Sequence, residues 1–465
     1  MARLFQNTLY ISIAHGWQMA MAIVLIPFAT RYLGDEGFGK YSLATTIMYF
    51  VFLFNDFGLN TLATREIART KNKTQTFFGE VLGLKLLLIL SSLIFIVLFS
   101  LFANYDKETY LVIWIFAICG ILGSFTQLGY AVFRAHERME LQTFIAVLEK
   151  TISTILSIFV LVAGYTLIAF SNMFLFASVV AIILSMLIIS KKFVSISAKF
   201  DWHRFKPLIT SALAFGFSMF LATIYNQVDI VMLSMMKKMD AVGWYGAAYK
   251  LLSFTNLVPT IFATAFFPRM SMSADNREEI SKIFSVGIKY LLLLAIPLIP
   301  GVFILAEKIT ILVFSDEFIN SSVAIRILVF ASGILFINIF LAGLYGATNH
   351  QIKIVIIQVI GLVVNVVLNA LLIPKYSYIG AAITTIITEG LVIILALSWA
   401  LRNICDIREF SFLPKALFAA TIMSLFLLIF NNLHVILSIL IAVAIYSILI
   451  ILLGAINLQQ LKKHF

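Results

Sequence analysis

The sequence is poor in charge. Only 12% of its 465 residues are charged, whereas a soluble domain carries about 25%, so the chain has half the charge that a water-facing surface needs. Hydrophobic residues make up 62% of the chain, and windows of the roughly 20 apolar residues that a spanning helix requires follow one another almost from end to end. The composition therefore predicts an all-α polytopic membrane protein.

The motifs of soluble enzymes are also missing. The two cysteines, Cys119 and Cys405, lie far apart in the sequence and suggest neither a disulfide framework nor a metal site. The chain has no glycine-rich phosphate loop and no zinc-type histidine spacing. We therefore expect no enzyme, no metal and no cofactor. The first apolar stretch, 9–33, is too long for a signal peptide and lacks a small-residue cleavage site, so we expect it to be retained.

Apolar windows separated by short polar breaks predict about fourteen transmembrane helices. The longest polar interruption, 191–206, separates the sixth window from the seventh. The predicted spans are 9–33, 42–64, 80–103, 109–133, 143–164, 168–190, 208–235, 243–267, 284–305, 323–345, 354–373, 379–401, 412–430 and 435–457.

Basic residues concentrate in alternate loops, which the positive-inside rule places in the cytoplasm. The richer set consists of Arg3, Arg65, Arg69, Lys71, Lys73, Arg134, Arg138, Lys191, Lys192, Lys199, Arg204, Lys206, Arg269, Arg277, Lys282, Lys353, Arg402, Arg408, Lys415, Lys462 and Lys463. The poorer set consists of Arg31, Lys40, Lys107, Lys237, Lys238, Lys308 and Lys375. We therefore expect both termini in the cytoplasm. Attraction to anionic headgroups then explains the net charge of +11 without nucleic-acid binding.

The two halves of the sequence repeat each other at an offset of 204 residues. The shift matches Gly39-Lys40-Tyr41 to Gly243-Trp244-Tyr245, Arg65 to Arg269, and Gly83-Leu84-Lys85 to Gly287-Ile288-Lys289. An even number of spans separates the copies, so they have the same orientation, as in alternating-access carriers. We expect an N-lobe at 1–190, a cytoplasmic linker at 191–207, a C-lobe at 208–402 and a C-terminal helix pair at 403–465.

Ionisable side chains inside spans cost roughly 2.5–3.5 kcal/mol on insertion scales and are usually turned inward or paired. Lys250 is the first candidate for a functional role, because it lies about eight residues, or ~12 Å, inside the eighth span. It either lines a cavity and attracts a phosphate-bearing headgroup, or forms an ion pair with Asp229 on the seventh span.

Four further basic residues are weaker candidates for a cationic cavity. Lys85 and Lys289 lie near cytoplasmic span ends, where either snorkelling to the interface or a basic cavity wall explains them. Arg31 lies near an outer span end, as a cationic rim or an interfacial anchor. Lys150 follows Glu149 on the fifth span, so that one of the two can pair with another span while the other faces water.

Four acids, Asp56, Glu149, Asp229 and Glu389, are candidates for ion coupling or for structural roles. Glu389 lies near the middle of the twelfth span, where burial favours the protonated carboxyl. This position suits a coupling site for a proton, although a helix-to-helix hydrogen bond explains it too. Asp56 is expected to pair with nearby basic groups. The coupling ion is expected to be a proton or sodium.

Four stretches of the chain resemble the polysaccharide-transporter branch, which includes O-antigen-unit flippases, of the multidrug/oligosaccharidyl-lipid/polysaccharide flippase superfamily. They lie in order over some 390 residues. These stretches are Thr30-Arg31-Tyr32-Leu33-Gly34 with Gly37-Phe38-Gly39-Lys40-Tyr41; Asp56-Phe57-Gly58-Leu59 with Arg65-Glu66; Val242-Gly243-Trp244-Tyr245 through Lys250-Leu251 to Pro268-Arg269; and Asn369-Ala370-Leu371-Leu372-Ile373-Pro374 with Gly380-Ala381-Ala382 and Thr384 to Glu389.

The resemblance implies two six-helix lobes with a basic central cavity, in a bacterial inner membrane. It implies a substrate carried on undecaprenyl pyrophosphate and moved from the cytoplasmic to the periplasmic leaflet. A polysaccharide polymerase and chain-length machinery are expected partners. Lipid II flippases depend on several arginines in the first spans, whereas Arg31 is the one basic residue within the first span here. The departure favours an O-antigen or other surface-polysaccharide unit as the substrate.

Two other functions remain as alternatives. A cation-coupled multidrug exporter of the same superfamily is expected to have acids in its cavity, yet basic residues slightly outnumber acidic ones within the spans. A membrane-embedded glycosyltransferase or polymerase is expected to have catalytic acids or a large outer loop, and the outer loops here are short.

Overall fold

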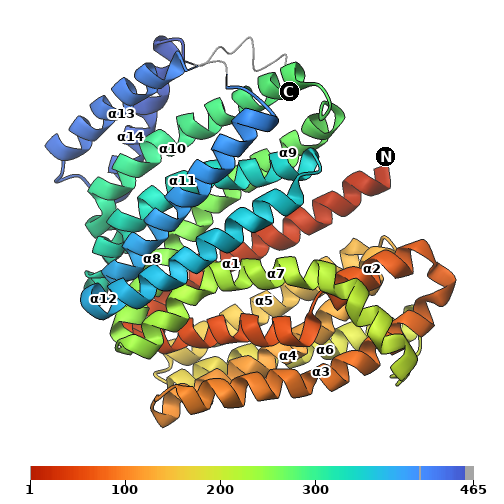
Figure 1. Ribbon diagram of the computed structural model, residues 1–465. Coiled ribbons are helices and arrows are strands. Elements are labelled where there is room, and N and C mark those ends of the chain that lie inside the picture. The colour runs from red at the N-terminus through yellow and green to blue at the C-terminus, as the bar shows by residue number, and fades with distance from the viewer. Residues whose placement is uncertain (1, 408–409, 456–465) are drawn as a thin grey trace. The chain divides into compact units, whose positions relative to one another are not determined.

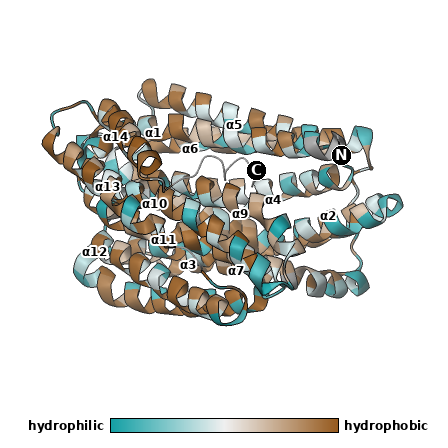
Figure 2. Ribbon diagram, turned by 90° about the horizontal axis from the view of Figure 1, so that it is seen from above, coloured by the Kyte–Doolittle hydropathy of each residue, from teal (hydrophilic) through white to brown (hydrophobic). Residues whose placement is uncertain are grey.

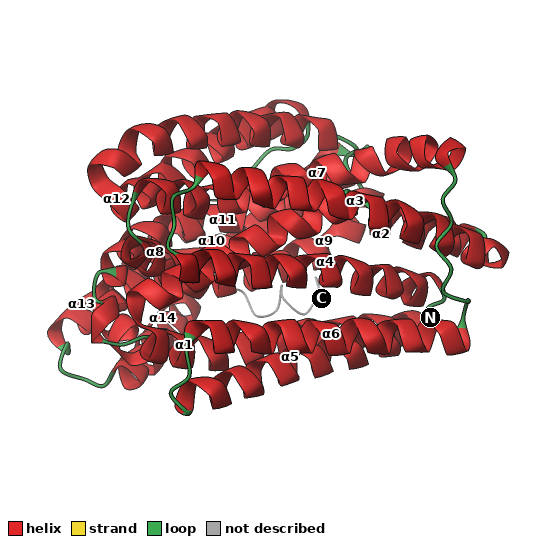
Figure 3. Ribbon diagram, turned by 90° about the horizontal axis from the view of Figure 1, so that it is seen from below, coloured by secondary structure: helices red, strands yellow, loops and turns green. Residues whose placement is uncertain are grey.

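The computed structural model of the protein describes residues 2–407 and 410–455, together with the side chains of these ranges except at 2–5 and 214. All regular secondary structure in this part of the chain is helical (Figure 3). The helices are α1 (Ala2–Asp56), α2 (Leu59–Arg69), η1 (Lys71–Lys73), α3 (Thr74–Phe102), α4 (Lys107–Ala135), α5 (Met139–Val162), α6 (Leu167–Lys192), α7 (Trp202–Met236), α8 (Met239–Ser253), η2 (Phe254–Asn256), α9 (Leu257–Met272), α10 (Arg277–Val313), η3 (Asp316–Phe318), α11 (Ser321–Ala347), α12 (Gln351–Asn403), α13 (Phe412–Ile429) and α14 (Val435–Leu452).

Within the described residues, twelve helices are long and apolar enough to cross a membrane. Two of these helices are long enough to cross a membrane twice. The apolar part of α1 is 51 residues long and α12 is 53 residues long, whereas one crossing takes about 20 residues. Each contains one non-helical residue, Gly34 in α1 and Ser377 in α12, between two of the predicted spans. The prediction of an all-α protein with about fourteen spans is confirmed.

Several helices extend beyond the predicted spans by a few residues, and two predicted spans are interrupted. The second span ends at Asp56 and not at residue 64, because Phe57 and Gly58 have positive φ angles of 44° and 86° and start the separate helix α2. The eighth span is divided by η2 into α8 and α9. Arg408, Lys462, Lys463 and the predicted end of the last span at 456–457 lie outside the described residues.

The chain divides into two compact units, Met1–Gly243 and Trp244–Phe465. The helix α7 belongs to the first unit, where it packs against α1, α2 and α3. The sequence analysis had placed this helix in the C-lobe. The predicted domain boundaries follow span counting and stay a prediction, whereas the unit boundary at Gly243 follows packing.

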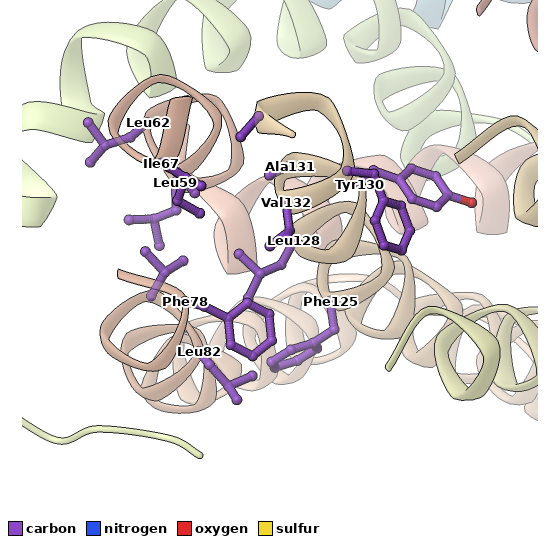
Figure 4. Close-up of a cluster of buried hydrophobic side chains, with 14 of the residues drawn as sticks. Leu59, Leu62, Ile67, Phe78, Leu82, Phe125, Leu128, Tyr130, Ala131 and Val132 are labelled. Atoms are coloured by element: carbon purple, nitrogen blue, oxygen red, sulfur yellow. The ribbon is translucent and has the colours of Figure 1, made fainter. Parts of the chain in front are cut away.

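In the first unit, α4 packs against α1, α6, α2 and α3, and α5 packs against α1 and α6 (Figure 1). A core of buried side chains fills the space between α2, α3 and α4, with Leu59, Phe78, Phe125 and Leu128 at its centre (Figure 4). Burial of one such side chain stabilises the fold by about 1.5–3 kcal/mol in water. In lipid, close packing takes over much of this role.

In the second unit, α11 packs against α12, α10 and α9, and the pair α13–α14 packs against α10. Hydrophobic residues predominate along most of the helices in both units (Figure 2), and many large hydrophobic side chains are exposed. Leu101, Ile429 and Leu452 are each at least 72% exposed. Apolar surface of this extent is what a bilayer, and not water, covers.

The segment 194–201, within the predicted linker, lies along the N-terminal part of α3. The side chain of Gln75 forms hydrogen bonds with both backbone groups of Ser195, each at 2.8 Å. The backbone N–H of Lys199 donates to the carbonyl oxygen of Gly79 at 2.9 Å. Just beyond, Arg204 lies 3.1 Å from the carboxylate of Glu80. The linker is thus held along its length.

Candidate functional site

A buried ion pair joins α1 to α3. Lys85 Nζ lies 2.8 Å from Asp56 Oδ1, and the side chains are 0% and 1% exposed. The lysine also donates to the hydroxyl of Ser124 at 2.7 Å and to the carbonyl oxygens of Ser124 and Asn55 at 3.2 and 3.5 Å. An ammonium group removed from water needs this many acceptors to offset several kcal/mol of lost hydration.

The arrangement differs from both interpretations of Lys85 in the sequence analysis. The lysine does not snorkel to the interface, because its ammonium is enclosed by α1 and α4. It also lines no cavity in this conformation, since it has no exposed surface. The expected pairing of Asp56 with a basic group is observed. A role for Lys85 in substrate binding stays a prediction.

The carboxylate of Asp56 also organises the turn at which α1 ends. It accepts hydrogen bonds from the backbone N–H groups of Gly58 and Asn60, both at 3.2 Å. These are among the first N–H groups of α2, which have no partner within that helix. The Asp56-Phe57-Gly58 motif is therefore a structural turn whose aspartate is fixed by Lys85.

The same turn lies in close contact with α7. A Cβ atom on Gly58 would lie 2.6 Å from the backbone nitrogen of Gly216, and one on Gly216 would lie 2.3 Å from the carbonyl oxygen of Phe57. Both distances are shorter than side chains tolerate, so the backbones meet here only because both residues are glycine.

A second glycine contact relates the two sequence copies. A Cβ atom on Gly39 would lie 1.9 Å from the carbonyl oxygen of Met239, and one on Gly243 would lie 2.0 Å from that of Asp35. Positions 39 and 243 are equivalent under the 204-residue shift, and so are 35 and 239. The contact is therefore reciprocal, as at the interface of a two-fold symmetric dimer.

Lys40, the neighbour of Gly39, is the centre of a charged cluster. Its ammonium lies 3.0 Å from Glu36, 3.1 Å from Asp106 and 2.9 Å from Glu108. Burial alone would raise the pKa of the Asp106 carboxyl, but hydrogen bonds from Thr109 and Lys40 outweigh it and lower that pKa. The cluster ties α1, just after its kink, to the start of α4.

The remaining candidates of the first unit lie apart from this ion pair. Arg31 is exposed on α1. Glu149 and Lys150 are partly buried on α5, and neither forms an ion pair within the described residues. Glu149 instead accepts a hydrogen bond from the hydroxyl of Ser178 on α6, at 3.5 Å. Asp229 is buried on α7.

In the second unit, Lys250 is partly exposed on α8. Its predicted pairing with Asp229 joins residues of different units and stays a prediction. Lys289 lies 5.9 Å from the ring centroid of Phe412, a cation–π contact between α10 and α13. Although Lys85 and Lys289 are equivalent in sequence, their partners differ.

Glu389 forms a hydrogen bond between α11 and α12. The side-chain amide of Asn338 donates to Glu389 Oε2 at 2.6 Å and to the carbonyl oxygen of Glu389 at 3.3 Å. Nearby, the amide of Asn369 donates to Asn365 at 2.9 Å. The sequence analysis weighed a helix-to-helix hydrogen bond through the protonated acid, whereas in the structure Glu389 accepts a hydrogen bond between these helices from the amide of Asn338. Ion coupling through Glu389 stays a prediction.

The sequence analysis missed the uncharged partners of these groups. Asn55, Ser124 and Asn338 were not singled out, yet they complete the two buried networks. Each is a polar residue within an apolar window, and this signal could have found them. Because many such residues only bond to their own helix, the signal alone does not identify a network.

Curated proteins similar to the chain have names that refer to glycan export or synthesis. A putative O-antigen transporter of Escherichia coli strain K12 is 25% identical over 416 residues, which cover 86% of this chain and 97% of that protein. The probable low-salt glycan biosynthesis flippase Agl15 of Haloferax volcanii is 24% identical, over 82% of this chain and 80% of that protein. The capsular polysaccharide biosynthesis protein CapF of Staphylococcus aureus is 23% identical, over 84% and 97%.

Solved structures share the fold. Lipid II flippase MurJ, in an inward closed conformation, has a TM-score of 0.79 at 18% identity over 95% of this chain and 98% of that chain. An inward-facing multidrug resistance MATE transporter has a TM-score of 0.69 at 15% identity over 85% and 98%. The MatE family model matches residues 214–371, and the model described as polysaccharide biosynthesis protein matches residues 4–274, more than half of the chain. The chain therefore belongs to the polysaccharide biosynthesis protein family.

Proposed function

We propose that the protein is a flippase for undecaprenyl-pyrophosphate-linked oligosaccharide, the repeat unit of an O-antigen or another surface polysaccharide. It moves this unit from the cytoplasmic to the periplasmic leaflet of a bacterial inner membrane, with both of its own termini in the cytoplasm. The names of its relatives support the class of substrate. A polysaccharide polymerase and chain-length machinery are its proposed partners.

The observation that carries the proposed mechanism is the reciprocal contact of Gly39 and Gly243. Each glycine approaches the backbone of the other sequence copy at a symmetry-equivalent position. The nearest atoms on both sides are backbone atoms, so we infer that the contact can open and close without a change of rotamers at the two glycines. A contact of this kind suits the outer closure of a carrier that works by alternating access.

The physical task of the protein is to shelter polar groups. Sugars and a pyrophosphate cannot cross hydrocarbon unaided, because each uncompensated polar group costs about 2–7 kcal/mol. In the proposed mechanism the headgroup passes through a hydrated path while the polyprenyl tail stays in lipid. Lys250 is the first candidate to neutralise the pyrophosphate, and Arg31, Lys150 and Lys289 are further candidates. A lysine attracts phosphate as a point charge without bidentate geometry, so the headgroup can also leave.

Lys85 has a different proposed role, as a positioning residue. Its ammonium fixes Asp56, and Asp56 fixes the turn that contacts Gly216. The ion pair thereby holds the inner end of α1 against α7. We further propose that a proton or sodium ion drives transport and that Glu389 takes part in this coupling through its contact with Asn338.

Complementation tests the proposed function. The gene is expressed in a strain that lacks its O-antigen-unit flippase, and surface polysaccharide is scored on gels and with antibody. Restored polysaccharide supports the proposal. Absence of polysaccharide, with the protein present at normal levels in the membrane and tested in hosts with different repeat units, contradicts it.

The alternative function is a cation-coupled multidrug exporter. The match of the MatE model to residues 214–371 is the observation that keeps it as the alternative. This function predicts that expression raises the drug resistance of an export-deficient host, measured as the minimum inhibitory concentration of cationic dyes. A rise in resistance without complementation would replace the flippase proposal by this one.

A further inference from the structure

The segment 194–201 belongs to a surface of the first unit that is rich in basic residues. Two stretches form this surface. Residues 65–80 include η1 and the start of α3, and residues 191–206 run from the last turn of α6 into α7. The side chain of Gln75 joins the two stretches through its hydrogen bonds with Ser195, both at 2.8 Å. We refer to them together as the basic surface.

The acids of the basic surface do not offset its positive charge. The two stretches contain nine basic and three acidic residues. Glu66 and Glu80 form ion pairs with arginines of the same surface, and Asp201 caps α7 by accepting the backbone N–H of His203. The adjacent turn 134–140, which contacts the end of α6, contains two arginines and two glutamates. It leaves the excess of positive charge unchanged.

The lysines carry most of this excess. Lys71, Lys73, Lys191, Lys192 and Lys199 are all exposed, and none of them forms an ion pair within residues 2–407 and 410–455. Two belong to η1, which directly precedes α3, and two to the last turn of α6, which leads to the segment bound by α3. Their charges therefore gather around the start of α3, where they repel one another unless an anion lies between them.

Lys199 shows the direction in which the charge is presented. A Cβ atom on Gly83 would lie 2.2 Å from the carbonyl oxygen of Lys199, and one on Gly79 would lie 3.1 Å from its Cγ atom. The ammonium group lies 3.5 Å from the hydroxyl of Thr76. The side chain thus runs back along α3, from the level of Gly83 toward the start of the helix. A lysine that snorkels from an apolar region to the headgroups runs in this way.

Exposed aromatic side chains follow Lys199 in the chain. Phe200 and Trp202 are 57% and 73% exposed, and the ring of Trp202 packs edge-on against Phe205 at a centroid distance of 5.6 Å. Tryptophan is enriched where the acyl chains of a bilayer meet the headgroups. Aromatic rings beside the backbone of Lys199, with ammonium groups nearer the start of α3, match the order of these two layers.

We propose that the basic surface binds the headgroups of anionic phospholipids in the leaflet that it faces. The lysines contact phosphate groups, and Phe200 and Trp202 lie at the boundary between headgroups and acyl chains. Five exposed lysines on three segments fit several mobile headgroups better than one enclosed ligand. In the proposed orientation this is the cytoplasmic leaflet, which carries the anionic lipids. The inference does not depend on the transported substrate.

Bound lipid would also stabilise the packing of the first unit. The basic surface includes parts of α3, α6 and α7, so headgroups that lie across it contact all three helices. A ligand that binds only the folded surface favours the folded state. Anionic lipid should therefore raise the melting temperature of the protein above its value in zwitterionic lipid.

Tryptophan quenching by brominated lipids tests the proposal. The full chain is placed in phosphatidylcholine nanodiscs that contain a minor fraction of brominated phosphatidylglycerol or, in a matched sample, of brominated phosphatidylcholine. The difference between the wild type and Trp202→Phe gives the signal of Trp202. We expect the anionic lipid to quench this signal about twofold more strongly, because it concentrates at the basic surface. Concentrated salt should reduce the difference.

A matched pair of variants tests the charges. Lys71→Gln, Lys73→Gln, Lys191→Gln, Lys192→Gln and Lys199→Gln, made together, should lower the ratio of the two quenching values to about one. Arginine at the same five positions keeps the charge and should keep the ratio. Lys353→Gln, at an exposed lysine outside the basic surface, should leave the ratio unchanged.

Four results would contradict the proposal. Equal quenching of the wild type by the two lipids excludes a preference for anionic headgroups. No quenching by either lipid places Trp202 outside the bilayer and leaves the basic surface to an acidic protein. A preference that survives in the glutamine variant does not come from the lysines. Relief of quenching by equimolar undecaprenyl pyrophosphate, but not by equimolar unbrominated phosphatidylglycerol, assigns the surface to the transported lipid instead.

Discussion

Two lysines that are equivalent in sequence have different partners because one acid is not repeated. Lys85 pairs with Asp56, whereas the position equivalent to Asp56 is Thr260. Without that carboxylate, Lys289 lies against the ring of Phe412. The two sequence copies therefore share a lysine at this position, but the side chains around the two lysines differ.

Removal of one partner of the buried ion pair should destabilise the fold strongly. Lys85→Met leaves Asp56 buried without a cation, which costs about 3–5 kcal/mol. The expected result is a clear fall in the melting temperature of the protein in detergent, measured by intrinsic fluorescence. Lys353→Met is the matched control, because that lysine is exposed. An unchanged melting temperature for Lys85→Met would mean that the pair does not hold α1 to α3.

Lys250 should matter for transport and not for stability. Its side chain is only partly buried on α8, so Lys250→Ala should leave the amount of membrane protein normal. Loss of the cation should abolish surface polysaccharide in the complementation assay. Full activity of Lys250→Ala would remove this residue from the proposed site, whereas Lys250→Arg should keep part of the activity.

Ionisable residues within spans can be found from the sequence because they are rare there, and all candidates of this kind could be named in advance. The residues with which they form hydrogen bonds or ion pairs could not be predicted. Whether Lys85 meets Asp56, and whether Glu389 meets Asn338, depends on how far each helix is rotated about its axis. Apolar windows without a clear polar face do not encode this rotation.

At the scale of the element, the proline-containing part of α10 receives a hydrogen bond from another helix. Pro297 has no N–H group, so the carbonyl oxygen of Leu293, four residues earlier, loses its usual donor within the helix. The hydroxyl of Tyr446 on α14 donates to this oxygen at 2.8 Å. The C-terminal helix pair is thus attached at the point where α10 lacks a bond.

A double-mutant cycle should show whether the Tyr446 hydroxyl replaces the N–H donor that Pro297 lacks. Tyr446→Phe should cost about 1 kcal/mol of stability, as expected for a buried hydrogen bond. In a Pro297→Ala background the restored N–H group can serve Leu293, so Tyr446→Phe should then cost clearly less. Thermal unfolding of the four proteins measures the coupling. Additive effects would show that the tyrosine does not replace the missing donor.

The glycine contact should be sensitive to one added carbon atom. In Gly39→Ala the new Cβ atom would meet the carbonyl oxygen of Met239 at 1.9 Å, so α1 and α8 must move apart. We expect loss of surface polysaccharide and faster labelling of a cysteine placed at position 239. Gly16→Ala lies on the same helix with nothing within 4 Å of its Cβ atom, and it should behave as the wild type. Normal activity of Gly39→Ala would exclude close backbone contact from the transport cycle.

Most helices could be predicted from the sequence, because each apolar window of sufficient length became a helix. The interruptions could not. Gly34 and Ser377 leave α1 and α12 continuous apart from one residue each, whereas Phe57–Gly58 and η2 divide spans that hydropathy leaves whole. Hydropathy predicts which segments lie in lipid. It contains no information on the backbone dihedral angles of single residues, which decide where a helix is interrupted.

At the scale of the whole chain, the distribution of basic residues makes a topology prediction. Alkaline phosphatase, which is active only outside the cytoplasm, should be active when fused after residue 107 or 238. It should be inactive when fused after residue 73 or 199. A fluorescent-protein fusion series, with the opposite requirement, serves as the control. Activity after residue 199 would reverse the proposed orientation.

The structure brings two positions that the offset of 204 residues makes equivalent, Gly39 and Gly243, into contact; the repeat over the rest of the chain stays a prediction. The compact units could not be predicted by counting spans. The helix α7 follows the longest polar break, but its contacts with α1, α2 and α3 place it with the helices before that break. A long polar stretch in the sequence indicates a loop between two helices, but it does not indicate which compact unit the following helix packs into.

The segment that lies along α3 has a practical consequence. A polar stretch between two groups of spans is where a gene is usually divided or a tag inserted. Here Gln75, Gly79 and Glu80 of α3 bind the segment by hydrogen bonds and a salt bridge. A tag inserted in the segment would therefore break these contacts with α3. If the gene is divided after residue 193, the second polypeptide begins with the segment that binds α3. We therefore expect two separately expressed polypeptides to assemble through this contact.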